Sequence, residues 1–295
     1  MIDMGKTVTL PKAPTLGPAY LKVISTDLLR KRKVQNSANA ALPSGAVAVR
    51  GLRIDPGKFA NYIRVTGLKL TGEAPSTYAF ILSQPLIMTI FADPRFPFQP
   101  NGLVHFENVI RQERPVSPDE RFNVRAWVDN LREHRKGLLF DATAEISVGN
   151  ELVWTQKSTL LKQQKTSLSD QPAPEPPQQK LPPVANLLSI GQFQIWDYAA
   201  ASGDFNPIHI SGPTAKLLGF PKAIAHGMWE AAAALRYVEG SVPPSHTYSA
   251  RFGRPLFLPG TVAVYVGKTQ EKTEIALRDR KTGAPHFQGT ISRNA

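Results

Sequence analysis

An acid and a base stand close together in one short segment of the chain. Asp204 and His209 flank Asn206 and Pro207. Pro207 fixes its own φ angle and disfavours the helical region for the residue before it, so we expect this segment not to be helical. Such a loop can aim a carboxylate and an imidazole at one point, where they could hold and activate a water molecule. A tight polar turn with a capping Asp and a surface His is the alternative, and the residues alone leave it open.

The residues around Asp204 are suited to fixing its backbone. Gly203 permits backbone angles that other residues resist. The side chain of Asn206 can hydrogen-bond neighbouring backbone groups and lock the loop. We therefore assign loop-positioning roles to Asn206 and to Ser202, which precedes Gly203.

A second chemical feature begins an apolar stretch. Gly227, preceded by His226, stands at the start of a helix expected over 226–238. An N–H in the first turn of a helix has no intrahelical acceptor, and the helix dipole adds positive potential there. This N–H could bind an oxygen that gains negative charge. Alternatively, the glycine only lets the helix approach a sheet closely. We expect His226 to pack or to anchor a loop rather than to catalyse.

The elements that position these residues occur twice. The segment from Tyr62 to Gly67 parallels the segment from Tyr198 to Gly203: Tyr, three residues, a hydroxyl residue, Gly. Further on, Arg114-Pro115 parallels Arg254-Pro255. Two matches in the same order indicate duplication of one unit. Since the first unit has Leu68 in place of the carboxylate, we expect it to have kept the fold and lost the chemistry.

Each unit is predicted to contain a short strand, a short helix, an irregular loop, a longer apolar helix and a series of strands. In the second unit, Ser189 is the expected N-cap of the short helix. The longer helices are expected over 77–90 and 226–238. The strands are expected over 47–54, 103–114, 120–131, 137–148 and 151–161, and over 184–188, 246–258, 261–269, 272–280 and 284–293. A long helix followed by such strands implies an α+β layer, and two such sheets could pair edge to edge.

Proline marks the boundary between the two units. The chain has 26 prolines, and six of them crowd the stretch from Pro172 to Pro183. Such a stretch cannot support a sheet ladder or a long helix. The predicted divisions are an N-terminal extension over 1–46, a first domain over 47–165, a linker over 166–183 and a second domain over 184–295.

Composition excludes several classes of protein. The chain has 295 residues, is 42% apolar and contains no cysteine. The apolar content argues against wholesale disorder, and the lack of cysteine excludes disulfides, thiolate zinc sites, iron–sulfur clusters and a Cys nucleophile. No apolar run is long enough to span a membrane. The first residues lack the apolar run of a signal peptide, so a cytoplasmic location is expected.

The chain is strongly basic, with a formal net charge of +12. Its basic runs, at 30–33, 132–136 and 278–281, lie far apart and lack the interleaved aromatics of an RNA-binding surface. A polyanionic ligand or carrier therefore explains the charge better than nucleic acid does.

The segment from Tyr198 to Ala215 resembles the hydratase-2 motif of the MaoC-like dehydratases, the (R)-specific enoyl-thioester hydratases of the hot-dog fold. The segment from Gly219 to Met228 is similar to the family's entry into its central helix, and Arg254 to Gly260 is similar to its next strand and turn. The first half, with Glu107-Asn108 before Arg114-Pro115 and with the segment from Asn130 to Gly137, resembles the non-catalytic half of two-hot-dog bacterial 3-hydroxyacyl-thioester dehydratases. Many relatives carry an acidic residue where this chain has Ser211, a departure outside the Asp/His pair.

The resemblance implies a double hot-dog that reversibly hydrates trans-2-enoyl thioesters to (R)-3-hydroxyacyl thioesters. Asp204 and His209 would activate the water, and the N–H of Gly227 would stabilise the enolate-like oxygen. No redox or metal cofactor is expected, and the thioester carrier would be CoA or acyl carrier protein. The expected assembly is a monomeric double hot-dog or a homodimer. The candidate substrate contacts are His226, Lys222, Arg236, Arg251 and Arg254.

Two competing functions remain open at the level of sequence. One is hydrolysis of acyl thioesters on the same fold, which also uses a carboxylate and a helix-terminal N–H. The other is a non-catalytic protein that binds acyl thioesters. In addition, the Phe-rich segment 91–102 is either a flap that lines an acyl tunnel or an ordinary loop that packs its Phe side chains into the core.

Overall fold

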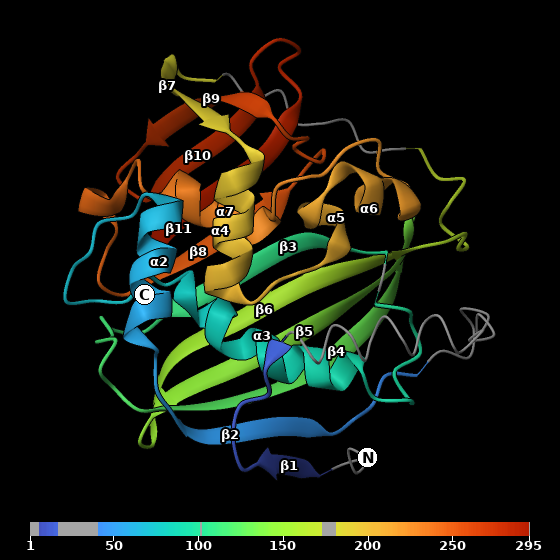
Figure 1. Cartoon of the computed structure of the whole chain (residues 1–295), viewed down its shortest axis with the longest axis vertical. Coiled ribbons are helices and arrows are strands. Elements are labelled where there is room, and N and C mark those ends of the chain that lie inside the picture. Colours follow the sequence, from blue (N-terminus) through green and yellow to red (C-terminus); the bar gives the residue numbers. More distant parts are fainter. Residues whose placement is uncertain (1–5, 17–40, 101, 173–180, 295) are drawn as a thin grey trace.

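One large sheet forms the frame of the molecule (Figure 1). The computed structural model describes residues 6–16, 41–100, 102–172 and 181–294. Eleven strands follow the order β1-β2-β4-β5-β6-β3-β8-β11-β10-β9-β7. The strands are β1 (Thr7–Leu10), β2 (Ala46–Leu52), β3 (Leu103–Gln112), β4 (Phe122–His134), β5 (Gly137–Val148), β6 (Glu151–Gln163), β7 (Val184–Ile190), β8 (His246–Phe252), β9 (Gly260–Lys268), β10 (Lys272–Asp279) and β11 (Pro285–Arg293).

The sheet consists of two equivalent halves. The first half has the order β2-β4-β5-β6-β3, and the second half repeats it as β7-β9-β10-β11-β8. Strands β3 and β8 join the halves as an antiparallel pair, with Glu107 opposite Arg251. This topology confirms the predicted α+β double hot-dog with two sheets paired edge to edge.

The helices pack either on the sheet or on one another (Figure 1). They are α2 (Pro56–Thr66), α3 (Tyr78–Phe91), α4 (Gln192–Ser202), α5 (Pro207–Ile210), α6 (Gly212–Leu217) and α7 (Gly227–Leu235), with a 3₁₀ turn at Glu239–Ser241. Helix α3 packs on β2, β4, β5 and β6, while α7 packs on β10 and β11. The four alanines over 231–234 are fully buried, and their small side chains allow α7 to approach the sheet closely.

Some local expectations were wrong. Ser189 is not an N-cap, because β7 continues through it to Ile190. Gly191 caps α4 instead, and its N–H donates to Oε1 of Gln194 at 2.9 Å. In the N-terminal extension, β1 adds a strand parallel to β2 that the sequence interpretation did not include.

Two predicted features lie wholly or partly outside the described residues. The whole basic run at 30–33 is outside, and so is the central part of the linker, 173–180. The described residues place the end of β6 at Gln163 and the start of β7 at Val184. Among the described helices, none is long and apolar enough to cross a membrane.

The Phe-rich segment is part of the core. Phe91, Phe96 and Phe98 are all buried. Their rings gather around Phe140 of β5, with centroid distances of 6.0, 5.6 and 5.5 Å. The predicted packing of these side chains into the core is therefore observed, and a role in lining an acyl tunnel remains a prediction.

Candidate active site

The end of helix α4 sets the direction of Asp204. Gly203 adopts the left-handed conformation, with φ 77°, and ends the helix. The Oγ of Ser202 donates to the carbonyl of Tyr198 at 2.7 Å and accepts the N–H of Asp204 at 3.2 Å. Ser202 thus ties the backbone of Asp204 to the last turn of the helix, in keeping with its predicted positioning role.

A short helical turn then carries His209. One carboxylate oxygen of Asp204 accepts the N–H of Asn206 at 3.2 Å, and the side chain of Asn206 accepts the N–H of Ile208 at 3.4 Å. Asn206 is therefore the N-cap of α5, and Pro207 occupies its first turn. The expectation of a non-helical segment was wrong here: a proline that disfavours helix before it is well suited to begin one.

His209 is held as a neutral base. Its Nδ1 lies 2.9 Å from the carbonyl of Ile224. A carbonyl can only accept, so Nδ1 carries the proton and Nε2 keeps its lone pair. The pKa of His209 is lowered to about 3, first by burial and then by the neighbouring His226, while the charge of Asp204 opposes both effects. At neutral pH the ring can accept a proton but does not carry a charge.

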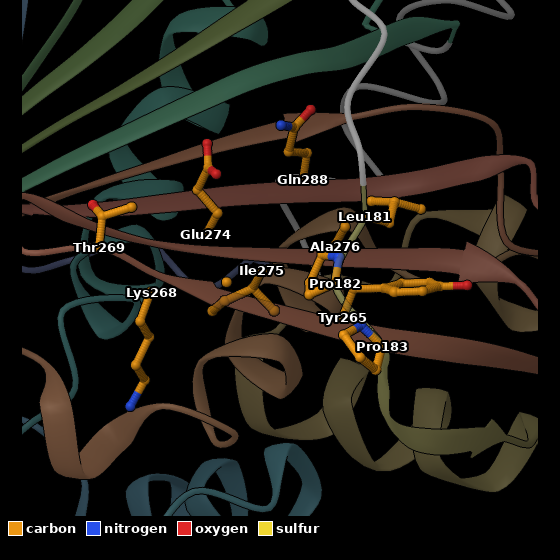
Figure 2. Close-up of a pocket in the computed structure, with 11 residues that line it drawn as sticks. Leu181, Pro182, Pro183, Tyr265, Lys268, Thr269, Glu274, Ile275, Ala276 and Gln288 are labelled. Carbon is orange, nitrogen blue, oxygen red and sulfur yellow. The ribbon is translucent and has the colours of Figure 1, made fainter.

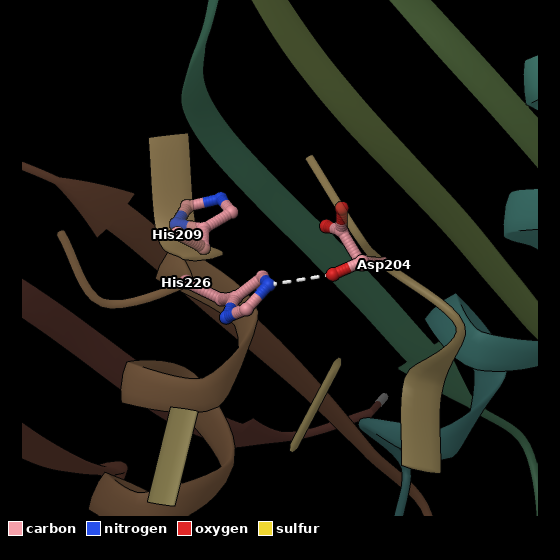
Figure 3. A group of neighbouring side chains, drawn as sticks. All are labelled: Asp204, His209 and His226. Atoms are coloured by element: carbon pink, nitrogen blue, oxygen red, sulfur yellow. Dashed lines mark hydrogen bonds between the residues drawn. The ribbon is translucent and has the colours of Figure 1, made fainter. Parts of the chain in front are cut away.

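His226 anchors the loop to helix α7 (Figure 3). Its Nε2 donates to the backbone carbonyl of Asp204 at 2.9 Å. Its ring stacks on His209 with a centroid distance of 3.7 Å and an interplanar angle of 27°. Burial lowers the pKa of His226 as well. The predicted anchoring role fits these contacts.

Gly227 begins α7 directly after His226, which has extended backbone angles. Its N–H is therefore one of the helix-terminal groups that lack an intrahelical acceptor. A Cβ added at this position would lie 2.9 Å from two ring carbons of Phe252 on β8. Both interpretations of the glycine thus have a structural basis: an N–H at the start of a helix and a close approach to the sheet.

The five candidate substrate contacts do not form one group. Arg236 follows the C-terminal end of α7, opposite to Gly227, and packs against Gly67, where an added Cβ would meet its guanidinium at 2.6 Å. Arg251 pairs with Glu107 at 3.3 Å. Lys222 and Arg254 are exposed. Contacts between these basic residues and a substrate remain predictions.

His105 is a residue that the sequence interpretation left without a role. It lies on β3 of the first half, and its ring centroid is 4.6 Å from that of Phe252. The pKa of His105 is lowered to about 4 because burial outweighs the opposing charge of Asp204. Nothing in the sequence marks this proximity, because it depends on how two strands from different halves meet.

Three of these groups also have the geometry of possible metal ligands. Asp204, His209 and His226 each offer one ligand atom, and these atoms lie within 4.8 Å of one another. One nitrogen of each ring is already hydrogen-bonded to a carbonyl. The prediction of a metal-independent site remains a prediction.

A separate hollow of about 430 Å³ lies elsewhere, on the second half of the sheet (Figure 2). The end of the linker, Leu181 to Pro183, forms one wall, and strands β9, β10 and β11 provide the rest. The loop that carries Asp204 and His209 does not line it.

The paired hot-dog halves, with an Asp/His loop beside the start of a helix, define the class of protein. Residues 170–285 match the family described as the MaoC like domain. The alignment with a named dehydratase covers 85% of the chain. The chain belongs to the MaoC-like dehydratases.

Two comparisons illustrate this membership, and a third shows the shared fold alone. The protein 3-hydroxyacyl-thioester dehydratase X of Mycobacterium tuberculosis is 45% identical over 252 residues, which cover 85% of this chain and 90% of that protein. The crystal structure of HtdX from the same organism superposes with a TM-score of 0.76 at 40% identity, covering 85% of this chain and 100% of that one. A MaoC-like dehydratase of Phytophthora capsici, 20% identical with a TM-score of 0.63, covers 85% of this chain and 96% of its own, and shares the fold.

Proposed function

We propose that this protein catalyses the reversible hydration of trans-2-enoyl thioesters to (R)-3-hydroxyacyl thioesters. The observation that carries the proposal is the convergence of Asp204 and the neutral His209, next to the helix start at Gly227. The mycobacterial relative, named a 3-hydroxyacyl-thioester dehydratase, supports the same reaction.

In the hydration direction, the water oxygen bonds to C3 while one of its protons moves to the Asp204/His209 pair. The electrons of the C2–C3 double bond shift toward the thioester oxygen, where the N–H of Gly227 stabilises the developing charge. The pair then returns one proton to C2. The reaction adds one H and one OH, so the pair ends in its starting state. Dehydration follows the reverse path.

Each supporting residue has a task in this scheme. The lone pair on Nε2 of His209 can take a proton because the ring is held neutral and its Nδ1–H is fixed on Ile224. The caps by Ser202 and Asn206 fix the backbone of the loop on both sides of Asp204. His226 ties that loop to the helix that presents Gly227, so acid–base group and oxyanion donor keep their spacing.

The thioester carrier is proposed to be CoA or acyl carrier protein. Both are polyanionic, which agrees with the net charge of +12. If basic side chains contact the carrier, KM should rise with salt, because the Debye length falls from about 10 Å at 0.1 M to about 3 Å at 1 M. An N-acetylcysteamine thioester lacks the phosphates, and its KM should be insensitive to salt. An equal response of both substrates would contradict a carrier contact.

One assay separates this proposal from its alternatives. Purified protein is mixed with crotonyl-CoA, and the enoyl absorbance and the free thiol are followed in parallel. Loss of absorbance without release of thiol is expected. Release of thiol would indicate a thioesterase, and no change in either signal would indicate a binding protein.

A further inference from the structure

A bulge in β3 changes the direction of His105. In the register with β6, His105 lies opposite Leu160 and Glu107 opposite Thr159, so Phe106 has no partner. Arg251 contacts both Glu107, at 3.3 Å, and the ring of Phe106, at 5.4 Å. The consecutive side chains of Phe106 and Glu107 therefore lie on the same face of the sheet, because the bulge interrupts the alternation of faces along the strand. Bulges often re-aim a side chain next to an active site.

The ring of His105 lies between aromatic residues from both halves. It stacks on Phe80 of α3, with a centroid distance of 5.8 Å, and approaches Phe252 of β8 at 4.6 Å. Phe252 is the ring that lies over Gly227. His105 is thus only one aromatic ring away from the start of α7, although β3 belongs to the first half.

The polar atoms of His105 are not all satisfied. Its Nε2 is shielded from solvent and has no hydrogen-bond partner among the described residues. We assign the proton of the neutral ring to Nδ1, so that Nε2 keeps a lone pair. A buried acceptor without a partner is costly, and a ligand that supplies a donor would remove that cost.

The charge of Asp204 also reaches His105. The carboxylate opposes the lowering of the pKa of His105 that burial causes, as it does for His209 and His226. A neutral acceptor near a carboxylate is well placed to share a water molecule with it, since water offers two hydrogens.

We propose that His105 is a third polar group of the catalytic centre, contributed by the N-terminal half. Its Nε2 accepts a hydrogen bond from the water that adds to C3, or from the 3-hydroxyl group that leaves. The ring neither gains nor loses a proton, because the Asp204/His209 pair performs the transfer. This inference rests on the proposed hydration of enoyl thioesters.

Two variants separate hydrogen bonding from packing. His105→Phe keeps an aromatic ring between Phe80 and Phe252 but removes both nitrogens, whereas His105→Gln keeps a polar group. With (R)-3-hydroxybutyryl-CoA, kcat/KM should fall about 10- to 100-fold for His105→Phe and less than about 5-fold for His105→Gln, the size expected for one buried hydrogen bond. The matched control is His134→Phe. The ring centroid of His134 lies 5.5 Å from that of Phe106. The His134→Phe substitution should leave kcat/KM unchanged.

Butyryl-CoA reports on the pocket itself, because it lacks the 3-hydroxyl group. Its inhibition constant should stay within about threefold of wild type in His105→Phe, since the ring stacking that shapes the pocket is kept. Equal losses in butyryl-CoA binding and in turnover would overturn the inference in favour of a packing role. Full activity of His105→Phe would also overturn it while leaving the proposed function intact. A wild-type protein that turns over neither thioester would overturn both.

Discussion

Helix α2 of the first half and helix α4 of the second half end in the same way. Gly67 and Gly203 both adopt the left-handed conformation, with φ angles of 74° and 77°. The hydroxyl before each glycine, on Thr66 or Ser202, donates to the carbonyl four residues back at 2.7 Å. The predicted repeat is therefore a repeat of backbone geometry as well as of residues.

The halves diverge at the next position and at the start of the longer helix. Leu68 is buried in the first half where the second half carries the partly exposed Asp204. Helix α3 begins with Tyr78, whose ring packs at 5.1 Å from that of Tyr62, whereas α7 begins with Gly227. The loop scaffold is thus kept in the first half without the carboxylate, and the N–H that begins α3 is already hydrogen-bonded to the carbonyl of Pro75 at 2.8 Å.

The largest effect should come from the residues that only the second half has. Asp204→Asn and His209→Ala should each lower kcat by roughly 10²–10⁴, the range for positioned acid–base groups. The double variant should be little worse than the worse single variant, because groups that hold one water act as a unit. Steady-state rates with crotonyl-CoA test this, and fully multiplicative losses would rule out a shared water.

Leu68→Ala is the matched control in the first half. It should cost about 2–5 kcal/mol of unfolding free energy, since Leu68 is buried, but leave kcat nearly unchanged. Loss of turnover in a folded Leu68→Ala protein would show that the first loop is not silent.

Gly227→Ala sharpens the contrast between the two helix starts. The added Cβ would lie 2.9 Å from Phe252, so the helix start or the ring must shift. We expect kcat to fall by roughly 10²-fold, the scale for a lost oxyanion donor. Adding Phe252→Leu should make room for the Cβ but also removes a ring that packs on His105, so only part of the rate should return. If Gly227→Ala alone is fully active, this glycine has no special role.

Part of the loss of stability at acidic pH should come from His209 in the second half. His209 has a folded pKa near 3 and titrates near 6.5 when unfolded, so below about pH 6.5 the unfolded state binds a proton that the folded state does not. This contribution to stability is present above pH 6.5 and is lost as the pH falls, by about 1.4 kcal/mol per pH unit. Urea unfolding at pH 7, 6 and 5 should show a shallower decline for His209→Asn. Parallel curves for variant and wild type would contradict the buried neutral histidine.

The smallest expected effect on kcat distinguishes the hydroxyl group of Ser202 from that of Thr66. Ser202→Ala should lower kcat by a few fold, because Ser202 also accepts the N–H of Asp204, and should cost about 1 kcal/mol of stability. Thr66→Ala should destabilise the fold at least as much without changing kcat. Equal kinetic effects of the two variants would mean that the hydroxyl supports only the fold.

The sequence predicted the strands well because turns and alternating patterns mark them locally. It also predicted that Asp204 and His209 could converge, because the loop between them is short. It could not predict the contact of His226 with the Asp204 carbonyl, which depends on the packing of α7. His105 was missed because a bulge that skips Phe106 decides its direction, and a bulge leaves no mark in a pattern of period two.

The antiparallel junction of β3 and β8 bears on whether either half could exist alone. Glu107 to Gln112 pair with His246 to Arg251 along this junction. A separated half would expose that strand as an open edge, a template for pairing with other chains and hence for aggregation. The half without the Asp/His loop therefore protects the other half from self-association, a reason for selection to retain it whatever its part in turnover.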